Sequence, residues 1–270
     1  MQAVPAGQAR AVFRFAPSPN GRLHLGHAFS ALLNEKMAGA AHGRLLLRIE
    51  DTDVTRSRQT FIAGIFEDMD WLGIDFEEPV RIQSEHFSDY EQNLQRLWQM
   101  EAIYPCFCSR KSAATLAARD PDGQPHYGGT CRALARNVAE ARMKAGDPFG
   151  WRLKTQGDAV VWGDAVIARR GTGSSYHIAV VTDDALQGVT HVVRGRDIEP
   201  QTPLHMQLQR LLGLPTPHYH HHDLILDEAG GKLSKSAHSV ALAELRAQGV
   251  SADEVRARLG FEAAASSSMA

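Results

Sequence analysis

The sequence has few cysteines and no long apolar run, and both shortages limit the kind of protein it can encode. Only three of the 270 residues are cysteine, and all three lie between positions 106 and 131. An odd, clustered number favours a metal site in a reducing compartment over a disulfide framework, so we expect a cytoplasmic protein. There is no run of 18 apolar residues to form a spanning helix, and no signal peptide is expected at the start.

An excess of charge of one sign is also missing. Twenty-nine Lys and Arg face 31 Asp and Glu, which gives a formal net charge of −2. The chain as a whole therefore has no general attraction to nucleic acid, and any RNA contact must come from local basic patches. With 43% hydrophobic residues, the chain is long enough to bury a sizeable core.

Apolar patterns predict that strands and helices alternate along the first hundred residues. Strands are predicted at 11–15 and 45–49, each followed by a segment with apolar residues on one helical face. This order predicts a parallel sheet with right-handed crossovers. Further strands are predicted at 159–168, 177–182, 189–194 and 224–226. Helix starts are predicted at two capping boxes and at one Thr-Pro pair: Ser88, Ser251 and Thr202.

A turn rich in Pro and Gly, followed by two histidines, joins the first predicted strand to the first helix. It ends in His24-Leu25-Gly26-His27. Open parallel sheets bind ligands at the carboxyl ends of their strands, and helix N-termini favour phosphates. Gly26 would let a phosphate or a purine approach the backbone, and the two histidines can donate hydrogen bonds to phosphate oxygens. Taken alone, such a segment is more often only a turn.

A glycine-led loop far along the chain supplies a second feature. It contains Lys232-Leu233-Ser234-Lys235-Ser236 and suits a mobile clamp on ATP phosphates. Together the two segments resemble the HIGH and KMSKS signatures of class I aminoacyl-tRNA synthetases, in the same order. The resemblance implies that Lys235 is the main catalytic residue, assisted by His24 and His27, and that Mg²⁺ arrives with ATP. It also implies these ATP-binding residues: His24, Gly26, His27, Lys232, Ser234 and Lys235.

Four further segments are similar to the catalytic domain of glutamyl-tRNA synthetase: 14–21, 47–53, 176–179 and 188–195. Arginines at strand ends can hold the carboxylates of glutamate bidentately, and a carboxylate side chain can accept its ammonium group. The resemblance implies a glutamate pocket made of Arg14, Ser18, Glu50, Tyr176 and Arg194. Val180 stands where family members that charge tRNA(Glu) often carry Asn, so contacts there are expected to differ.

The cysteines lie in a segment where the regular pattern is interrupted. Zn²⁺ takes four ligands in a tetrahedron, and this segment offers three thiolates: Cys106, Cys108 and Cys131. Short paralogues of glutamyl-tRNA synthetase have a similar arrangement, which implies Tyr127 as the fourth ligand. The imidazole of His126 is the more usual ligand chemically, and both alternatives stay open. We expect one structural Zn²⁺ per chain. A second metal site in the histidine run 218–222 is a weaker interpretation, since the resemblance places this run near ATP.

The resemblance implies an α/β fold: a HIGH-type, Rossmann-like, doubly wound parallel sheet with an inserted zinc-binding subdomain and a short helical C-terminal segment. The two halves of the nucleotide-binding catalytic domain are expected at 11–103 and 151–240. The insertion is expected at 104–150, and the C-terminal segment at 241–262. Residues 1–10 and 263–270, rich in Ala, Gly and Ser, are expected to be disordered.

Only 34 residues follow Ser236, too few for the anticodon-binding region of a bacterial glutamyl-tRNA synthetase. The chain therefore resembles the short paralogues, the glutamyl-Q tRNA(Asp) synthetases, which transfer activated glutamate to queuosine at the wobble position of tRNA(Asp). The resemblance implies ATP, L-glutamate and the tRNA(Asp) anticodon loop as partners of a monomer that contacts no membrane. Candidate phosphate contacts are Arg110, Lys111, Arg132, Arg136, Arg169 and Arg170.

Three other functions stay open at this point. They are charging of the 3′ end of tRNA(Glu), a ligase that loads glutamate onto an acceptor other than tRNA, and a catalytically silent tRNA-binding module. The presence of both nucleotide motifs counts against the silent module.

Overall fold

The computed structural model describes residues 10–109, 112, 114–121, 123, 125–225 and 240–262, and these form two compact units. Unit 1 contains the described residues up to Ile82, the segment Gly188–Asp197 and the described residues from Pro217 onward. Unit 2 contains Gln83–Gln187 and Ile198–Thr216. The chain passes from unit 1 to unit 2 twice, so each unit is assembled from distant parts of the sequence. Among the described helices, none has the length and hydrophobicity needed to span a bilayer.

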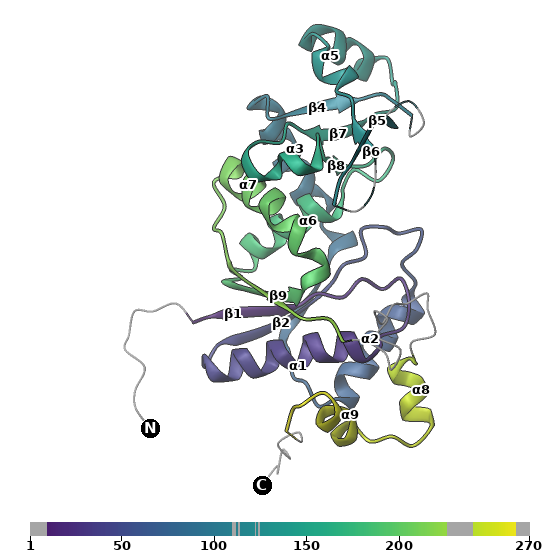
Figure 1. Cartoon of the computed structure of the whole chain (residues 1–270), viewed down its shortest axis with the longest axis vertical. Helices are drawn as coiled ribbons and strands as arrows, with labels where there is room; N and C mark the ends of the chain where they lie inside the picture. Colours follow the sequence, from purple (N-terminus) through teal and green to yellow (C-terminus); the bar gives the residue numbers. More distant parts are fainter. Residues whose placement is uncertain are drawn as a thin grey trace. The chain divides into compact units, whose positions relative to one another are not determined.

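Unit 1 is built on a five-stranded parallel sheet with the strand order β10-β9-β1-β2-β3 (Figure 1). The strands are β1 (Val12–Phe15), β2 (Arg44–Ile49), β3 (Glu77–Ile82), β9 (His191–Gly195) and β10 (His218–His222). Strands β2 and β3 lie on one side of β1, and β9 and β10 lie on the other. The winding direction therefore reverses at β1, and the predicted doubly wound parallel sheet is confirmed.

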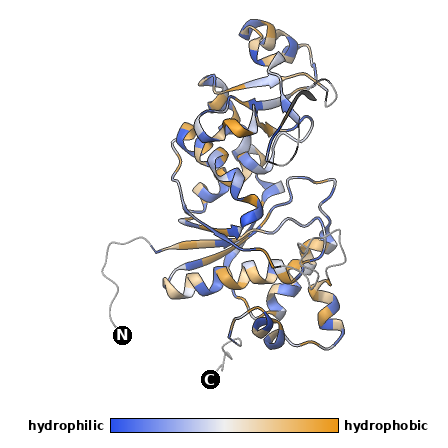
Figure 2. Cartoon of the chain, viewed as in Figure 1, coloured by the Kyte–Doolittle hydropathy of each residue, from blue (hydrophilic) through white to orange (hydrophobic). Residues whose placement is uncertain are grey.

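The described part of unit 1 also contains four helices: α1 (Leu25–Ala40), α2 (Gln59–Trp71), α8 (Leu242–Ala247) and α9 (Ala252–Arg258). Leu32 of α1, Ile65 of α2, Leu242 of α8 and Val255 of α9 are buried in one cluster with the apolar side of the sheet. Apolar residues dominate β1 in Figure 2, whereas these helices mix apolar and hydrophilic residues, as expected where only one helix side is buried. The capping box predicted at Ser251 is confirmed, and the short C-terminal helices are present.

Unit 2 combines a helical core with two small antiparallel sheets. Its helices are α3 (Phe87–Gln99), α5 (Arg136–Lys144), α6 (Tyr176–Leu186) and α7 (Thr202–Leu212). One sheet has the order β4-β7-β8, with β4 (Ile103–Cys106), β7 (Gly150–Leu153) and β8 (Val166–Ala168). The other pairs β5 (Ala114–Arg119) with β6 (Pro125–Tyr127). Short 3₁₀ turns are η1 (Gln83–Glu85), η2 (Thr130–Ala133), η3 (Gly157–Trp162) and η4 (Arg196–Gln201).

Several predicted elements were wrong, for identifiable reasons. The strand predicted at 177–182 is the first part of α6, where Ile178 to Thr182 are all buried. A helix buried on every side shows no periodicity that distinguishes it from a buried strand. The strand predicted at 159–168 is the 3₁₀ turn η3 followed only by the three-residue β8.

Two boundaries near histidines also differ from the prediction. The last strand of the sheet is β10, formed by the histidine run, and residues 224–225 lie outside any strand. This edge strand exposes His218 and His220, so it lacks the apolar pattern of a buried strand. Helix α3 begins after His86, and the capping box predicted at Ser88 is absent because Ser88 already lies within the helix.

Candidate active site

The two histidines of the HIGH-like turn form the N-terminal cap of α1. Nδ1 of His24 accepts a hydrogen bond from the Gly26 N–H (3.1 Å), and Nδ1 of His27 accepts one from the His24 N–H (3.2 Å). Their ring centroids lie 3.9 Å apart. A neutral imidazole that accepts at Nδ1 carries its proton on Nε2, so each ring has Nε2–H as its donor. The cap therefore places two N–H donors at the positive end of a helix, where phosphate oxygens bind favourably.

Gly26 leaves space for the His24 ring. A Cβ atom at this position would lie 3.0 Å from Cε1 and 3.1 Å from Nδ1 of His24. Both contacts are tighter than ordinary van der Waals packing, so a side chain at this position would force the His24 ring to shift by a few tenths of an ångström. The glycine of the motif is thus explained by the histidine two residues before it.

Three charged residues of the predicted glutamate pocket come from the carboxyl ends of neighbouring strands. Arg14 is next to last in β1, Arg194 is next to last in β9, and Glu50 follows the last residue of β2. Arg14, Arg194 and Glu50 are only 4%, 5% and 9% exposed, respectively. The winding reversal at β1 is where open α/β sheets bind their ligands. The fold therefore brings residues 14, 50 and 194 to one edge of the sheet in unit 1.

Both arginines lie on the sheet face away from α1. Phe13 and Val193 share a buried cluster with a residue of α1, whereas Val12 and Val192 belong to a separate buried cluster. Side chains alternate between the two faces along a strand. Arg14 lies two residues after Val12, and Arg194 lies two residues after Val192. Both arginines therefore face the same side of the sheet as these valines.

Residues of β10 pack against Arg194. His221 stands opposite Arg194 in the strand register, and its Nε2 accepts a long hydrogen bond from Arg194 Nε (3.4 Å). The guanidinium carbon lies 5.1 Å from the centre of the Tyr219 ring. Among the described residues, the histidines of this run form no cluster of three metal-binding side chains. At least one histidine of the run thus helps to hold the arginine.

Arg48 is a charged residue that the sequence reasoning missed. It lies in β2, is fully buried, and its Nη2 is 3.2 Å from Oε1 of Glu50. This buried ion pair restrains the orientation of the Glu50 carboxylate. The signal was present, because an arginine within an otherwise apolar strand is rarely buried without an ionic partner.

The remaining predicted pocket residues are placed differently. Ser18 lies half-buried in the turn after β1, in unit 1. Tyr176 is the first residue of α6, in unit 2, where its ring contacts that of His205 at 5.5 Å between centroids. Val180 is 1% exposed within the helical core of unit 2, which explains its apolar character.

The predicted lysine clamp, Lys232, Ser234 and Lys235, lies outside the described residues. The chain after it returns to the HIGH-like turn. Ala241 forms an isolated antiparallel bridge with His24, and the Leu242 N–H donates to the Leu23 carbonyl at 2.9 Å. Residues 241 and 242 are thus fixed beside the histidine cap.

The three cysteines come together in unit 2. Their Sγ atoms all lie within 4.8 Å of one another, and Sγ of Cys108 is 3.6 Å from Sγ of Cys131. Two sulfurs on a tetrahedral Zn²⁺ with Zn–S bonds of about 2.3 Å lie roughly 3.8 Å apart. The cluster therefore fits a metal ion after only small adjustments. Cys106 comes from the end of β4, and Cys131 comes from η2.

The two candidates for a fourth ligand differ clearly in position. The Tyr127 hydroxyl lies 3.5 Å from Sγ of Cys108 and accepts the Cys131 N–H at 2.6 Å. In contrast, Nε2 of His126 lies 2.9 Å from the carbonyl oxygen of Val161. The geometry therefore favours Tyr127.

Burial and hydrogen bonding shift the pKa values of the groups in this cluster in opposite directions. Burial raises the pKa of Cys108 and of Tyr127. Burial also acts to raise the pKa of Cys131, but hydrogen bonds from the Tyr127 hydroxyl and the Phe107 N–H outweigh it, and the pKa is lowered. Cys131 therefore supplies a thiolate more readily than Cys108 does.

Comparison with known proteins agrees with this geometry. The model of the catalytic domain of class I tRNA synthetases (E and Q) matches residues 10–265. The glutamyl-Q tRNA(Asp) synthetase of Rhodobacter capsulatus is 44% identical over 93% of this chain and 100% of its own length. The glutamate–tRNA ligase of Aquifex aeolicus is 38% identical over 87% of this chain and 54% of its own length.

Solved structures give the same picture. A glutamate tRNA ligase from Elizabethkingia meningosepticum, in complex with its amino acid, has a TM-score of 0.74 at 27% identity. It covers 84% of this chain, and the match spans 52% of the ligase. The chain thus spans about half the length of the glutamate ligases and the whole length of the Rhodobacter relative.

Proposed function

The chain belongs to the family of class I tRNA synthetases for E and Q, and from this premise we propose that it activates L-glutamate with ATP and transfers it to queuosine at the wobble position of tRNA(Asp). It is a ligase of the glutamyl-Q tRNA(Asp) synthetase type. The observation that carries the activation step is the meeting of Arg14, Glu50 and Arg194 at the switch point of the sheet. The choice of acceptor is supported by full-length similarity to the Rhodobacter relative.

Each group of glutamate has a matching partner in this proposal. Arg14 and Arg194 hold the two carboxylates, and Glu50, restrained by Arg48, accepts the ammonium group. Ser18 and Tyr176 add neutral hydrogen bonds. Buried arginines discriminate strongly against amino acids that lack the second carboxylate, because such a ligand leaves one guanidinium without its partner.

The nucleotide is held by the cap of α1 and by the lysine clamp. His24 and His27 donate their Nε2–H groups to phosphate oxygens, and Gly26 lets the phosphates approach. Lys232, Ser234 and Lys235 complete the binding, with Lys235 opposite the charge that develops on the leaving group. Mg²⁺ enters bound mainly to the phosphates of ATP.

The reaction has two steps and needs no covalent enzyme intermediate. An α-carboxylate oxygen of glutamate attacks the α-phosphorus of ATP, the bond to the bridging oxygen breaks, and pyrophosphate leaves. A hydroxyl of the acceptor nucleoside then attacks the carbonyl carbon, loses its proton, and AMP leaves. Positioning and charge stabilisation by the residues above supply the catalysis.

One Zn²⁺ is proposed to be held by Cys106, Cys108, Cys131 and Tyr127. A site with four protein ligands has no open coordination position, so this metal would stabilise the fold of unit 2 rather than take part in the reaction. The division of the chain into catalytic halves 11–103 and 151–240, an insertion at 104–150 and a C-terminal segment at 241–262 is part of the same proposal.

Pyrophosphate exchange into ATP tests the activation step. Exchange should depend on glutamate and should be at least 100-fold weaker with glutamine or aspartate, since each breaks one carboxylate–arginine match (an estimate of about 10² from the loss of a buried charged pair). Absence of glutamate-dependent exchange, both with and without tRNA, would reject every function in which this chain activates glutamate.

Charging of the 3′ end of tRNA(Glu) is the second candidate, because the Aquifex glutamate ligase is 38% identical to this chain. It predicts labelling of tRNA(Glu) without queuosine.

A further inference from the structure

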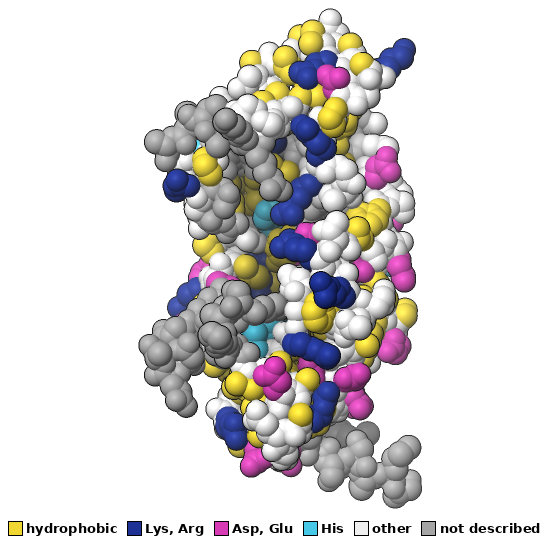
Figure 3. All heavy atoms as spheres, turned by 90° about the vertical axis from the view of Figure 1, so that its right-hand side faces the viewer, with side chains coloured by type: hydrophobic (Ala, Val, Ile, Leu, Met, Phe, Trp, Pro, Cys, Tyr) yellow, Lys and Arg dark blue, Asp and Glu magenta, His cyan; other side chains and the backbone are white. Residues whose placement is uncertain are grey.

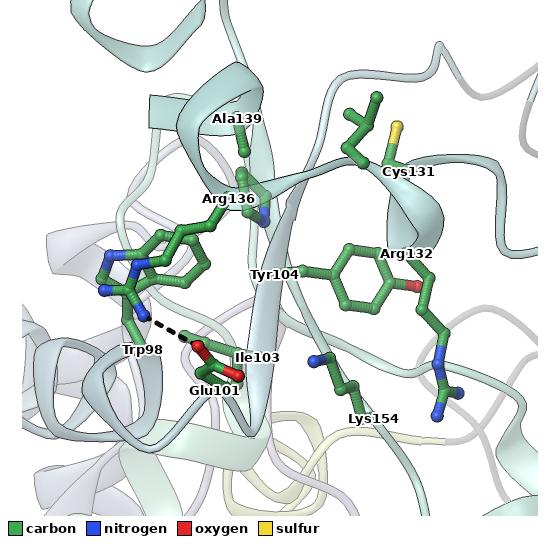
Figure 4. Close-up of a pocket in the computed structure, with 11 residues that line it drawn as sticks. Trp98, Glu101, Ile103, Tyr104, Cys131, Arg132, Arg136, Ala139 and Lys154 are labelled. Atoms are coloured by element: carbon green, nitrogen blue, oxygen red, sulfur yellow. Dashed lines mark hydrogen bonds and ion pairs between the residues drawn. The ribbon is translucent and has the colours of Figure 1, made fainter. Parts of the chain in front are cut away.

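We propose that a basic pocket in unit 2, at the junction of β4, β7 and the start of α5, binds a backbone phosphate of the RNA acceptor through Lys154. This inference rests on the proposed function, because it names where the acceptor RNA is held. Figure 4 shows the pocket, whose volume is about 140 Å³. That is several times the roughly 30 Å³ that one water molecule occupies in the liquid, so a phosphate group can be accommodated.

The pocket is lined by both apolar and charged residues. Ile103, Pro105, Leu134 and Ala139 contribute the apolar part. The charged part consists of three cations and one acid: Arg132, Arg136, Lys154 and Glu101. An excess of cations attracts anions, and the partial exposure of the pocket suits a ligand that remains largely in solvent.

Both arginines already have partners that hold them in place. Arg136 lies 3.4 Å from the Glu101 carboxylate and stacks over the Trp98 ring at 4.3 Å from its centre. Arg132 makes an ion pair with the Asp164 carboxylate at 2.8 Å. These contacts account for the arginines structurally and partly neutralise them.

Lys154 differs from the two arginines. Its backbone is fixed, because its N–H donates to the Ala102 carbonyl (2.9 Å) and its carbonyl accepts from Nε2 of Gln207 (2.9 Å). Among the residues that the structure describes, no carboxylate or carbonyl oxygen pairs with its ammonium group. A lysine stem anchored in a strand-end segment thus presents an uncompensated positive charge to the pocket (Figure 4).

The surrounding sequence points to RNA as the source of the phosphate. Residues 104–170 contain eleven Lys or Arg and six Asp or Glu, a formal charge of +5 in a chain whose total is −2. On the face of unit 2 seen in Figure 3, Lys and Arg side chains are spread over the surface while acidic side chains lie mainly toward the right margin. Several partly exposed cations spread over a surface suit a polyanion, whose phosphates each release counterions on binding.

Binding of queuosine-containing tRNA(Asp) to the full chain, measured by filter retention at several salt concentrations, tests the proposal. Lys154→Ala should weaken binding about 5- to 10-fold and should lower the slope of log K against log salt by about 1, as expected for one lost phosphate contact. Lys154→Arg should keep most of the affinity. Lys144→Ala, an exposed lysine on α5 outside the pocket, is the matched control and should change binding less than 2-fold (an estimate for a single screened surface charge).

Other outcomes would overturn the assignment. Equal losses in Lys154→Ala and Lys144→Ala would mean that only overall charge matters. Unchanged binding in Lys154→Ala would mean that the pocket does not contact RNA. Millimolar inorganic phosphate at constant ionic strength should not compete. If it displaces tRNA from the wild type but not from Lys154→Ala, the pocket takes free phosphate instead.

Failure of this proposal differs from failure of the proposed function. Lys154→Ala should leave glutamate-dependent pyrophosphate exchange within 2-fold of the wild type, since the pocket contacts no residue assigned to glutamate or ATP (a change that small is below about 0.4 kcal/mol). Absent exchange in the wild type rejects the activation chemistry. Normal exchange with unaltered RNA binding in the variant rejects only the pocket.

Discussion

Unit 1 and unit 2 both gather charged side chains, but they hold them in opposite ways. In unit 1, Arg14 and Arg194 are only 4% and 5% exposed, and they lie near the ends of adjacent strands. In unit 2, the side chains of Arg132 and Arg136 are 48% and 41% exposed. Buried charges act strongly and at fixed geometry, whereas exposed charges are screened and act additively. The difference matches the two roles proposed above: recognition of a small charged substrate in unit 1 and binding of a polyanion in unit 2.

The largest effect should follow from removing a buried charge of unit 1. Arg194→Ala should lower glutamate-dependent pyrophosphate exchange by about 10²–10³-fold, since breaking a buried ionic contact costs roughly 3–5 kcal/mol. Arg194→Lys should recover little, because lysine cannot reproduce the bidentate geometry. Arg196→Ala is the control, since Arg196 is exposed and pairs with the exposed Asp223. If Arg194→Ala lowers exchange by less than about 10-fold, Arg194 does not bind glutamate as proposed.

Loss of the metal should destabilise unit 2, which contains the cysteine cluster. Cys131→Ser should reduce bound zinc from about one per chain to near zero and should destabilise unit 2, as expected for a structural site. Metal analysis and thermal unfolding check this. Tyr127→Phe should lower zinc affinity by about 10-fold or more, whereas His126→Ala should retain the metal. The reverse order would make His126 the ligand.

A smaller effect is expected from the glycine of the histidine cap. Gly26→Ala should lower exchange about 10-fold, because the added Cβ would displace the His24 ring that donates to phosphate. Gly39→Ala is the matched control in the same helix, since a Cβ there meets nothing within 4 Å. It should leave exchange unchanged and slightly raise the melting temperature. Equal activity in both variants would show that the cap tolerates a side chain.

The smallest expected effect is a pH dependence of stability in unit 1. Asp68 on α2 is 1% exposed, and burial raises its pKa to about 6, although the nearby Arg246 acts in the opposite direction. Because the folded-state pKa lies above the ordinary value of 3.8, the contribution of Asp68 to stability is lost as pH rises through about 6.

Asp68→Asn removes this ionisation while keeping an oxygen that can accept from Arg246. Its melting temperature should rise relative to the wild type between about pH 4.5 and about pH 7.5, by roughly 2–4 °C for a change of about 1 kcal/mol. Asp70→Asn, at an exposed position of the same helix, should show no such pH-dependent difference. A constant difference between Asp68→Asn and the wild type across this range would contradict the assignment.

The nucleotide end of unit 1 was the most predictable part from sequence. The turn that carries the two histidines and the strands before and after it follow from local pattern, because glycine, proline and runs of apolar residues act over a few positions. The meeting of Arg194 with Arg14 does not, since 180 residues separate them and only the order β9-β1 brings them together. The burial of Arg48 beside Glu50 needed the sheet, and so did the contact of His221 with Arg194.

Unit 2 was less predictable. Its helix α6 has an unbroken apolar run, and burial on all sides removes the periodicity that distinguishes a helix from a strand. The pocket around Lys154 depends on how β4, η2 and α5 pack, which no local pattern encodes. The choice between Tyr127 and His126 likewise depends on the Val161 carbonyl, which lies 35 residues from His126 in sequence.

The most direct test of the whole account is the transfer of labelled glutamate to purified tRNA(Asp). Three acceptors should be compared: tRNA with queuosine, the same tRNA without queuosine, and queuosine-containing tRNA trimmed of its 3′-terminal adenosine. We predict that labelling requires queuosine and persists after trimming, because the acceptor is the wobble nucleoside. Labelling of the queuosine-free tRNA, or its loss on trimming, would contradict the account.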